Sequence, residues 1–436
     1  LIKLVLIIAF LGVISCLYIY GRGLNGPPIR SDGFGYYAYL PSIFIDHNLS
    51  FRLAIENAPA GASLQYAYGI GTHPSTGKMF NKYTLGTAIL WTPFFLIADA
   101  FAHLFDFPRT GYSPPYQIAN IAAGIFFLCL GVIALFGTIQ RKFGSITAFP
   151  VIVLVVFATN VFHYGTYDAS FSHICSFAAI SVYISLLLYY QDNPINSRLW
   201  QPIVIGLMLA LITMIRAPNA IVGLLAVGII YKKMHHLHDP KKTLRDFLFF
   251  ILAFICGILP LLLYWRHAAG SLITDSYQIF PKPDGSLEGF YWSSPELANF
   301  LFSVKKGLFF WSPTVFLAFL ALPMFLKDDK VLGVLIGITL CMHIYICSSW
   351  WFWSFGGSFG SRPFVDMMPI VALPLAVGVY HVRKLISDVD IWTLVSILVA
   401  INLILMLGYW HNYIPFDGTT VEILKELPKK LWCLCK

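Results

Sequence analysis

The sequence predicts an all-α polytopic integral membrane protein. Of its 436 residues, 58% are hydrophobic and only 11% are charged, which is too little polar surface to coat a soluble globule. Many apolar segments reach the length of about 20 residues that a helix needs to cross a bilayer. The basic residues occupy short connections between these segments. The net charge of +8 therefore indicates membrane topology and not nucleic-acid binding.

The apolar segments predict about eleven transmembrane helices. With edges uncertain by a few residues, they are 4-20, 116-138, 146-163, 170-190, 199-215, 217-231, 246-265, 308-326, 330-347, 363-380 and 391-410. We interpret the first as a retained signal anchor, because little basic sequence precedes it and no A-x-A-like cleavage site follows it. The sequence contains no fixed repeat and no low-complexity linker, so we expect 1-436 to form a single integral membrane domain.

The basic connections predict the orientation, because cytoplasmic loops carry an excess of Lys and Arg. With a cytoplasmic N-terminus, pairs such as Arg141-Lys142 and Arg383-Lys384 fall inside the cell. The other side, which in a bacterium is the periplasm, then receives long segments rich in aromatic residues, proline and glycine. These segments are 21-115, 266-307, 348-362 and the tail 411-436.

One apolar segment, 84-105, is excluded from the crossings. Counting it would place Arg141 outside and invert every later loop. It is interrupted by Pro93 and carries Asp99 and His103. We therefore expect a juxtamembrane amphipathic or re-entrant helix on the outer face, within a first extracytoplasmic loop that covers 21-115.

Asp32 is the best catalytic candidate. The string Ser31-Asp32-Gly33 follows the first predicted helix directly, so this carboxylate would lie near the outer membrane boundary. Flanking glycines allow close backbone approach, and Tyr36 and Tyr37 are suited to stacking on a sugar. A carboxylate there can act as a general base on a hydroxyl. The alternative is an interfacial turn in which Asp32 caps the following helix.

A second outer cluster leads into the predicted helix 363-380. It combines aromatic residues such as Trp351 with serines, glycines and Arg362, and Pro363 suits a first helical position. An arginine at a helix N-terminus favours phosphate binding, although the spacing is not that of a P-loop. The alternative pairs Arg362 with Asp366 one turn later as a structural ion pair.

Other polar residues fall at the predicted outer ends of the helices. Ionisable groups at such depths usually face a cavity or a partner, so Lys82 and Arg216 are further candidate functional residues. Arg216 could instead extend its side chain to the outer surface. Candidate sugar or acceptor contacts, besides the tyrosines and tryptophan above, are Asp46, His73, Asp168 and His173.

Three clusters resemble metal sites, but we expect none of them to bind metal. Two lie in basic loops that we place in the cytoplasm, and the third is a terminal C-x-C with no second pair. They are Asp388 with Asp390, the group His235, His236, His238 and Asp239, and Cys433 with Cys435.

Together these features resemble the GT-C glycosyltransferases. The resemblance rests on an aspartate just beyond the first helix, a semi-inserted helix before the second, and an outer arginine and aromatic loop late in the chain. The local strings are those around Asp32, Asn81-Lys82-Tyr83 and 356-363. Within that superfamily the chain looks most similar to the bacterial serotype-converting O-antigen glucosyltransferases.

The resemblance implies transfer of one sugar, glucose in that branch, from a polyprenyl-phosphate sugar to a glycan acceptor such as lipid-linked O-antigen, at the outer face of the bacterial inner membrane. Asp32 would be the base for an inverting attack, and Arg362, Lys82 and Arg216 would hold the phosphate. The chain departs from many relatives because no second carboxylate stands beside Asp32. A role for a divalent cation is therefore left open, and no metal ligand is assigned.

Two other functions compete with a transferase. A transporter or flippase of lipid-linked saccharides would show repeat-related halves and midplane charges, whereas the polar residues here favour the outer ends. A non-catalytic assembly subunit predicts that Asp32 can be replaced without effect.

Overall fold

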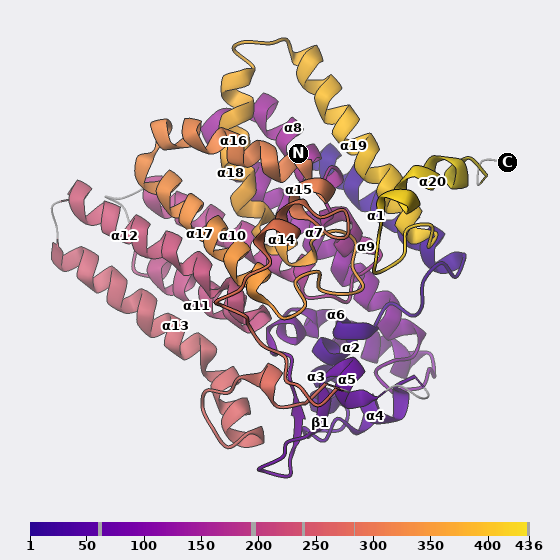
Figure 1. Ribbon diagram of the computed structural model, residues 1–436. Helices are drawn as coiled ribbons and strands as arrows, with labels where there is room; N and C mark the ends of the chain where they lie inside the picture. Colours follow the sequence, from indigo (N-terminus) through magenta and orange to yellow (C-terminus); the bar gives the residue numbers. More distant parts are fainter. Residues whose placement is uncertain (60–62, 193–197, 238–239, 283, 434–436) are drawn as a thin grey trace.

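The computed structural model describes the chain except for residues 60–62, 193–197, 238–239, 283 and 434–436 (Figure 1). The fold is helical. Its only sheet, among the described residues, is an antiparallel pair formed by β1 (Ile70–Thr72) and β2 (Met79–Asn81), with Ile70 opposite Asn81. Eight helices of the described chain are long and apolar enough to cross a bilayer. The prediction of a polytopic all-α membrane protein is confirmed.

Each of the eleven predicted crossings corresponds to an apolar helix. The longer ones are α1 (Ile2–Gly21), α7 (Pro114–Phe143), α10 (His173–Asp192), α13 (Pro240–Ala268), α17 (Lys330–Ser349) and α19 (Asp388–Trp410). The shorter ones are α8 (Ser145–Phe157), α11 (Trp200–Ile215), α12 (Gly223–Leu237), α16 (Pro313–Asp328) and α18 (Met368–Val382). Their large exposed apolar surface is what a lipid-facing bundle requires.

Several predicted crossings are divided into two pieces. The segment 146-163 breaks after α8, and α9 (Val161–Thr166) follows. The 3₁₀ turns η1 (Ala217–Val222) and η3 (Arg362–Met367) precede α12 and α18, and α15 (Leu308–Trp311) precedes α16. η1, α16 and η3 each have proline in their first turn, where the missing N–H costs no helical hydrogen bond.

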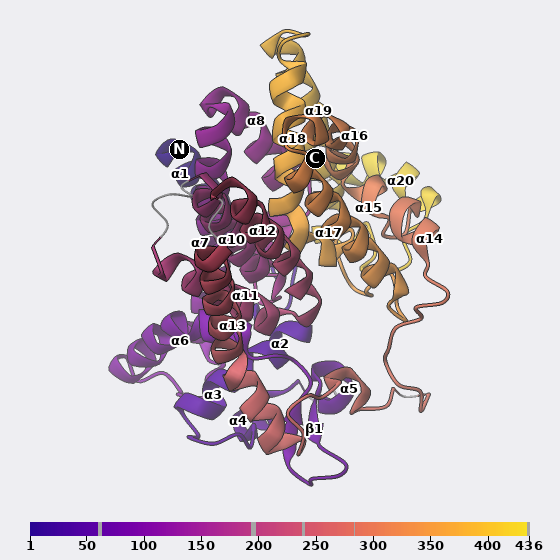
Figure 2. The ribbon, with the colours of Figure 1, turned by 90° about the vertical axis from the view of Figure 1, so that its left-hand side faces the viewer.

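The first predicted loop folds into short elements at one end of the bundle. These are α2 (Ser31–Tyr37), α3 (Tyr39–Phe44), α4 (Arg52–Asn57), α5 (Leu64–Tyr68) and the β-hairpin. Figures 1 and 2 show them gathered below the long helices, and the remaining outer segments carry η2 (Ser276–Gln278), α14 (Leu297–Phe302) and α20 (Val421–Trp432). This arrangement places the residues after the first helix beside those that begin α18.

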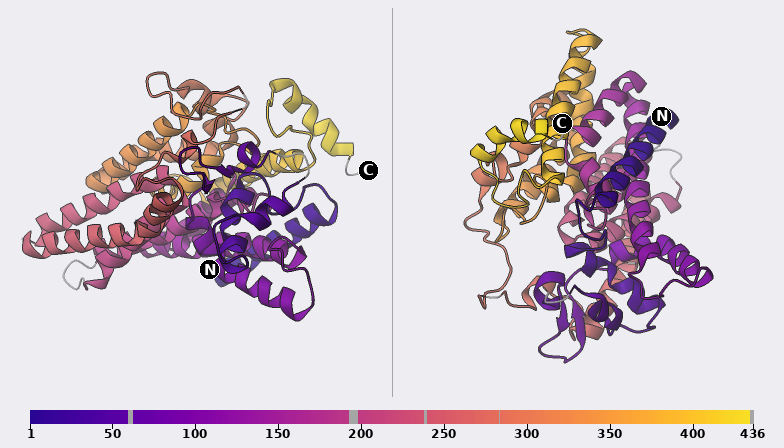
Figure 3. Two further views of the ribbon diagram at one scale, coloured as in Figure 1. Left: turned by 90° about the horizontal axis from the view of Figure 1, so that it is seen from below. Right: turned by 90° about the vertical axis from the view of Figure 1, so that its right-hand side faces the viewer.

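Helix α6 (Gly86–Leu104) occupies the segment that we expect to lie on the outer face. It packs against α7 and α11. Figures 2 and 3 show it leaving the bundle at an angle, at the end where α2 to α5 lie. Because its length and composition would also permit a crossing, its juxtamembrane position stays a prediction.

The connections that we expect in the cytoplasm meet at the end of the bundle away from α2. Lys232 Nζ lies 2.7 Å from Asp329 Oδ2, and His381 Nε2 lies 3.1 Å from Asp328 Oδ2. At the other end, Tyr291 N donates to Ser349 O at 2.6 Å, which joins the loops 266-307 and 348-362. The loops thus divide between two ends as their charge suggests, and which end faces the cytoplasm stays a prediction.

Candidate functional site

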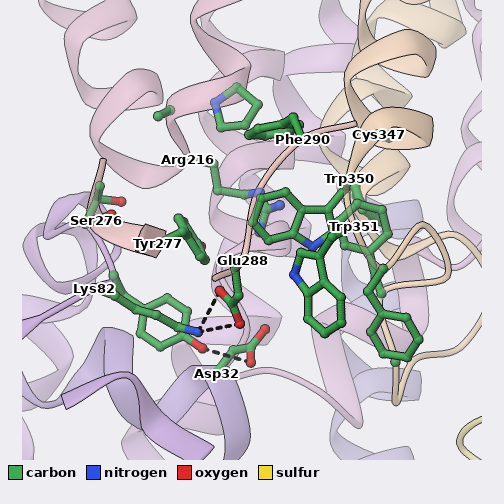
Figure 4. A pocket seen from close by; sticks show the side chains of 18 of the residues that line it. Asp32, Lys82, Arg216, Ser276, Tyr277, Glu288, Phe290, Cys347, Trp350 and Trp351 are labelled. Carbon is green, nitrogen blue, oxygen red and sulfur yellow. Dashed lines mark hydrogen bonds and ion pairs between the residues drawn. The ribbon is translucent and has the colours of Figure 1, made fainter. Parts of the chain in front are cut away.

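A cavity of about 790 Å³ lies where α2, the start of η1, the loop 266-307 and the segment after α17 meet (Figure 4). Asp32, the candidate base, and all three candidate phosphate-binding residues line it. Two of the expected sugar contacts also line it. The predicted residues in its wall are Asp32, Lys82, Arg216, Arg362, Tyr36 and Trp351.

Asp32 is the second residue of α2 and is held by two side chains. Its Oδ2 lies 2.9 Å from Arg362 Nη2, and Tyr83 donates its hydroxyl to Oδ1 at 3.0 Å. Burial raises the pKa of Asp32, but the cations of Arg362 and Lys82 and the Tyr83 hydrogen bond outweigh it, so the pKa lies below its ordinary value. The carboxylate is therefore ionised at neutral pH, and 26% of the side chain remains exposed.

The two glycines that follow Asp32 allow close packing. A Cβ at Gly33 would lie 2.1 Å from Ser170 Oγ, and one at Gly35 would lie 2.2 Å from the Tyr83 ring. The helix also begins with Ser31 at φ 49°, a left-handed conformation that costs free energy in a residue other than glycine. The local sequence thus presses α2 against its neighbours and turns Asp32 toward the cavity.

Lys82 follows β2 directly, and the hairpin fixes its position. Its N–H donates to Gly69 O at 2.8 Å, and its side chain crosses Gly69, where a Cβ would lie 2.4 Å from Lys82 Cγ. The ammonium lies 3.2 and 3.1 Å from the two carboxylate oxygens of Glu288, and 5.2 Å from the centre of the Tyr277 ring. Lys82 is therefore a fixed cation in the cavity wall.

Arg362 and Arg216 complete the set of cations. Arg362 pairs with Asp32, and Asp366 instead takes other partners. This fully buried carboxylate forms an ion pair with Arg216 Nε at 3.0 Å and accepts hydrogen bonds from Asn219 Nδ2 at 2.8 Å and from His173 Nδ1 at 2.9 Å. Arg216 is paired through Nε with Asp366 and also lines the cavity. Arg216 thus lies in an internal network.

The other predicted contact residues lie outside the cavity. Tyr37 donates to Gly111 O at 2.8 Å within an aromatic cluster, and Asp46 pairs with Arg52 near the surface. His73 lies in the hairpin turn, 3.1 Å from Ser75 Oγ, and Asp168 binds Arg30 and His163. His173 supports Asp366 from behind. Each of the five residues has a polar group engaged in these contacts, and His173 Nε2 is buried without a hydrogen-bond partner among the described residues.

Sequence reasoning missed the contribution of the loop 266-307. It provides Glu288, Tyr277, Phe290 and Trp292 to the cavity, opposite Lys82 and Tyr83. The string from Glu288 to Trp292 combines an acid with three aromatic residues in an outer loop, which is a signal for a sugar site. The partner of Glu288 could not be read from this signal, because Lys82 is distant in the chain.

Among the residues that the structure describes, no group of three or more His, Cys, Asp or Glu side chains is placed so that it could hold a metal ion. Asp390 caps α19 in a box with Ser387, and Asp388 pairs with Arg383 at 2.8 Å. The side chains of His235 and His236, and residues 238–239 and Cys435, lie outside the described residues. Cys433 is exposed at the end of α20.

Comparisons with known proteins add a structural neighbour. No family model matches the chain, and no curated protein matches it. Among solved structures it is similar to the crystal structure of ArnT from Cupriavidus metallidurans bound to undecaprenyl phosphate, with a TM-score of 0.46 and 14% identity. The match covers 92% of this chain and 63% of that one, so this chain spans less than two thirds of that protein's length. A functional assignment therefore depends on the cavity.

Proposed function

We propose that the protein is a GT-C-type membrane glycosyltransferase that moves one sugar from a polyprenyl-phosphate sugar to a glycan acceptor. One observation carries this proposal. An ionised, partly exposed carboxylate, Asp32, shares a cavity at one end of a helical membrane bundle with three fixed cations. Phosphate and a hydroxyl group are the two ligands that such a pair of charges suits.

The cations would bind the donor phosphate and stabilise it as a leaving group. Lys82, Arg216 and Arg362 reach the same space from three separate parts of the chain. An arginine presents paired N–H groups to phosphate oxygens, and a lysine adds a point charge. Because these cations are already in place, they stabilise the negative charge that develops on the leaving phosphate.

Asp32 would act as the base once the donor is bound. The donor phosphate would bind the Arg362 guanidinium and weaken its ion pair with Asp32. Asp32 Oδ2 would then be available to the acceptor hydroxyl. The acceptor oxygen then forms a bond to the anomeric carbon, and its proton passes to Asp32. The bond from that carbon to the phosphate oxygen breaks, and its electron pair leaves with polyprenyl phosphate. A single displacement of this kind inverts the anomeric configuration.

Aromatic side chains would bind the sugar. Trp350 and Trp351 stand beside the charged groups, as Figure 4 shows. Trp351 lines the cavity, and its indole ring offers a flat apolar surface on which a sugar can stack. Glucose as the sugar, lipid-linked O-antigen as the acceptor and the periplasmic face of the inner membrane as the location belong to the same proposal, on the strength of the sequence resemblance.

The test supplies labelled polyprenyl-phosphate sugars and acceptor to the purified protein in detergent. We expect transfer by the wild type and a loss of about 10²–10⁴-fold in Asp32→Asn, which keeps the shape but not the basic oxygen. Asp284→Asn, an exposed carboxylate elsewhere in the loop 266-307, should transfer normally. Unimpaired transfer by Asp32→Asn refutes the base assignment. Absence of wild-type transfer with every donor favours a flippase, which has no reaction to perform without a sealed membrane.

A further inference from the structure

Glu288 lines the cavity as the ion-pair partner of Lys82. Both of its carboxylate oxygens contact Lys82 Nζ, at 3.2 and 3.1 Å, and Figure 4 shows Glu288 reaching Lys82 beside Asp32. A carboxylate with two oxygens on one ammonium resembles an anionic phosphate group in charge and donor requirements. Glu288 and a bound lipid phosphate would therefore compete for the same cation.

The backbone next to Glu288 is fixed, while its side chain, which forms hydrogen bonds with Lys82 alone among the described residues, lies in the cavity wall. Gly289 O accepts from Trp351 N at 2.9 Å, and Tyr291 N donates to Ser349 O at 2.6 Å, so the loop is attached to the end of α17 immediately after Glu288. The exposed fractions of the paired side chains are 10% for Lys82 and 16% for Glu288. Because the pair lies in the wall of the cavity, rotation of one side chain into that cavity is enough to separate it.

The proposed reaction creates a need for such a competitor. A polyprenyl-phosphate sugar is a phosphodiester with one negative charge, whereas the polyprenyl phosphate that leaves is a monoester with a charge of about −1.5 to −2 at pH 7. Three cations attract the product more strongly than the substrate. Without a compensating feature, the site would retain its own product.

We propose that Glu288 is a displaceable counter-ion that sets turnover: it yields Lys82 to the donor phosphate and pairs with Lys82 again to help expel the polyprenyl phosphate product. This role rests on the proposed function. It assigns Glu288 to product release, while Asp32 carries out the chemical step. Most substitutions in a binding site weaken binding, whereas removal of this carboxylate should strengthen the binding of an anionic lipid.

The first experiment measures binding alone. Purified wild type and Glu288→Gln are titrated with polyprenyl phosphate in detergent, and we expect the variant to bind about fivefold more tightly. Glu288→Asp, whose shorter side chain reaches Lys82 less well, should fall between the two. Asp284→Asn removes the same charge from an exposed position in the same loop and should bind as the wild type does. Unchanged or weaker binding in Glu288→Gln overturns the proposal.

The second experiment separates chemistry from release. In Glu288→Gln the single-turnover rate of sugar transfer should equal that of the wild type, while steady-state kcat falls and the Ki of polyprenyl phosphate decreases about fivefold. A reduced single-turnover rate with an unchanged Ki would place Glu288 in the chemical step and contradict the counter-ion role. If the wild type transfers no sugar from any donor, the proposed function fails, and the binding measurement still decides whether Glu288 competes with the lipid phosphate.

Discussion

The charge state of Asp32 depends on the guanidinium of Arg362, the ammonium of Lys82 and the hydroxyl of Tyr83. All three stabilise the ionised form, which is why the pKa of Asp32 lies below its ordinary value in spite of burial. A carboxyl group with a lowered pKa keeps its negative charge to lower pH. A base of this kind is ready in the free enzyme across the neutral range, and its activity is lost only as the pH falls through the lowered pKa.

The contribution of Tyr83 can be tested by Tyr83→Phe. Loss of the donated hydrogen bond destabilises the carboxylate, so the pKa of Asp32 rises and the acid limb of kcat/KM moves to higher pH, by about half to one unit. The measurement is a pH profile of sugar transfer at low donor concentration. Tyr291→Phe removes a hydroxyl from an exposed tyrosine outside the cavity and should leave the profile unmoved. An identical profile in Tyr83→Phe would exclude Asp32 as the group that titrates.

Among the secondary-structure elements, the β-hairpin holds Lys82 in position. Gly69 has φ +65° and leaves the space through which the Lys82 side chain passes. Gly77, at the hairpin turn, has φ +66° but no atom within 4 Å of an added Cβ. The two glycines therefore share the same backbone requirement and differ only in contact with Lys82.

Substitution of Gly69 and of Gly77 therefore gives a matched test of whether the hairpin positions Lys82. Gly69→Ala and Gly77→Ala should each destabilise the hairpin by about 1–2 kcal/mol through left-handed strain. Only Gly69→Ala should also displace Lys82, which raises KM for the lipid-phosphate donor several-fold. Steady-state kinetics and thermal melting of both variants provide the comparison. An equal effect of the two substitutions on KM would show that the hairpin does not position Lys82.

For the whole molecule, the loops fall into two sets at opposite ends of the bundle. The set with Lys232 and Asp329 meets through ion pairs, and the other set encloses the cavity. Since short basic connections favour the cytoplasm, the cavity should open on the outer side. This assignment decides which pool of lipid-linked sugar the site can reach.

The orientation can be measured with reporter fusions. A reporter that is active only outside the membrane should give no signal when fused at Arg141, at the end of α7, and a strong signal at Gly285 in the loop 266-307. A strong signal at Arg141 would show that α6 crosses the membrane and that every later loop is inverted. A fusion at Lys384, in the connection before α19, serves as a second cytoplasmic control.

The features that depend on neighbouring residues in the chain could be predicted from the sequence. Apolar length predicts the helices, and the position of Asp32, Lys82 and Arg362 next to predicted helix ends places them at one surface. Contacts between residues distant in the chain could not be predicted from the sequence. Asp168 and Glu288 are both acidic residues in loops or at helix ends, and nothing local distinguishes them. Only the packing of α9 against α1 and α7 removes Asp168 from the cavity, and only the attachment of the loop 266-307 to α17 brings Glu288 into it.

The pairing of Asp32 with Arg362 has a consequence for biosynthesis. Asp32 is translated near the beginning of the chain and Arg362 near its end, so the carboxylate spends most of synthesis without its guanidinium. A chain released before η3 is made would lack the cation that lies 2.9 Å from Asp32 Oδ2, and this carboxylate would have no arginine partner on that side.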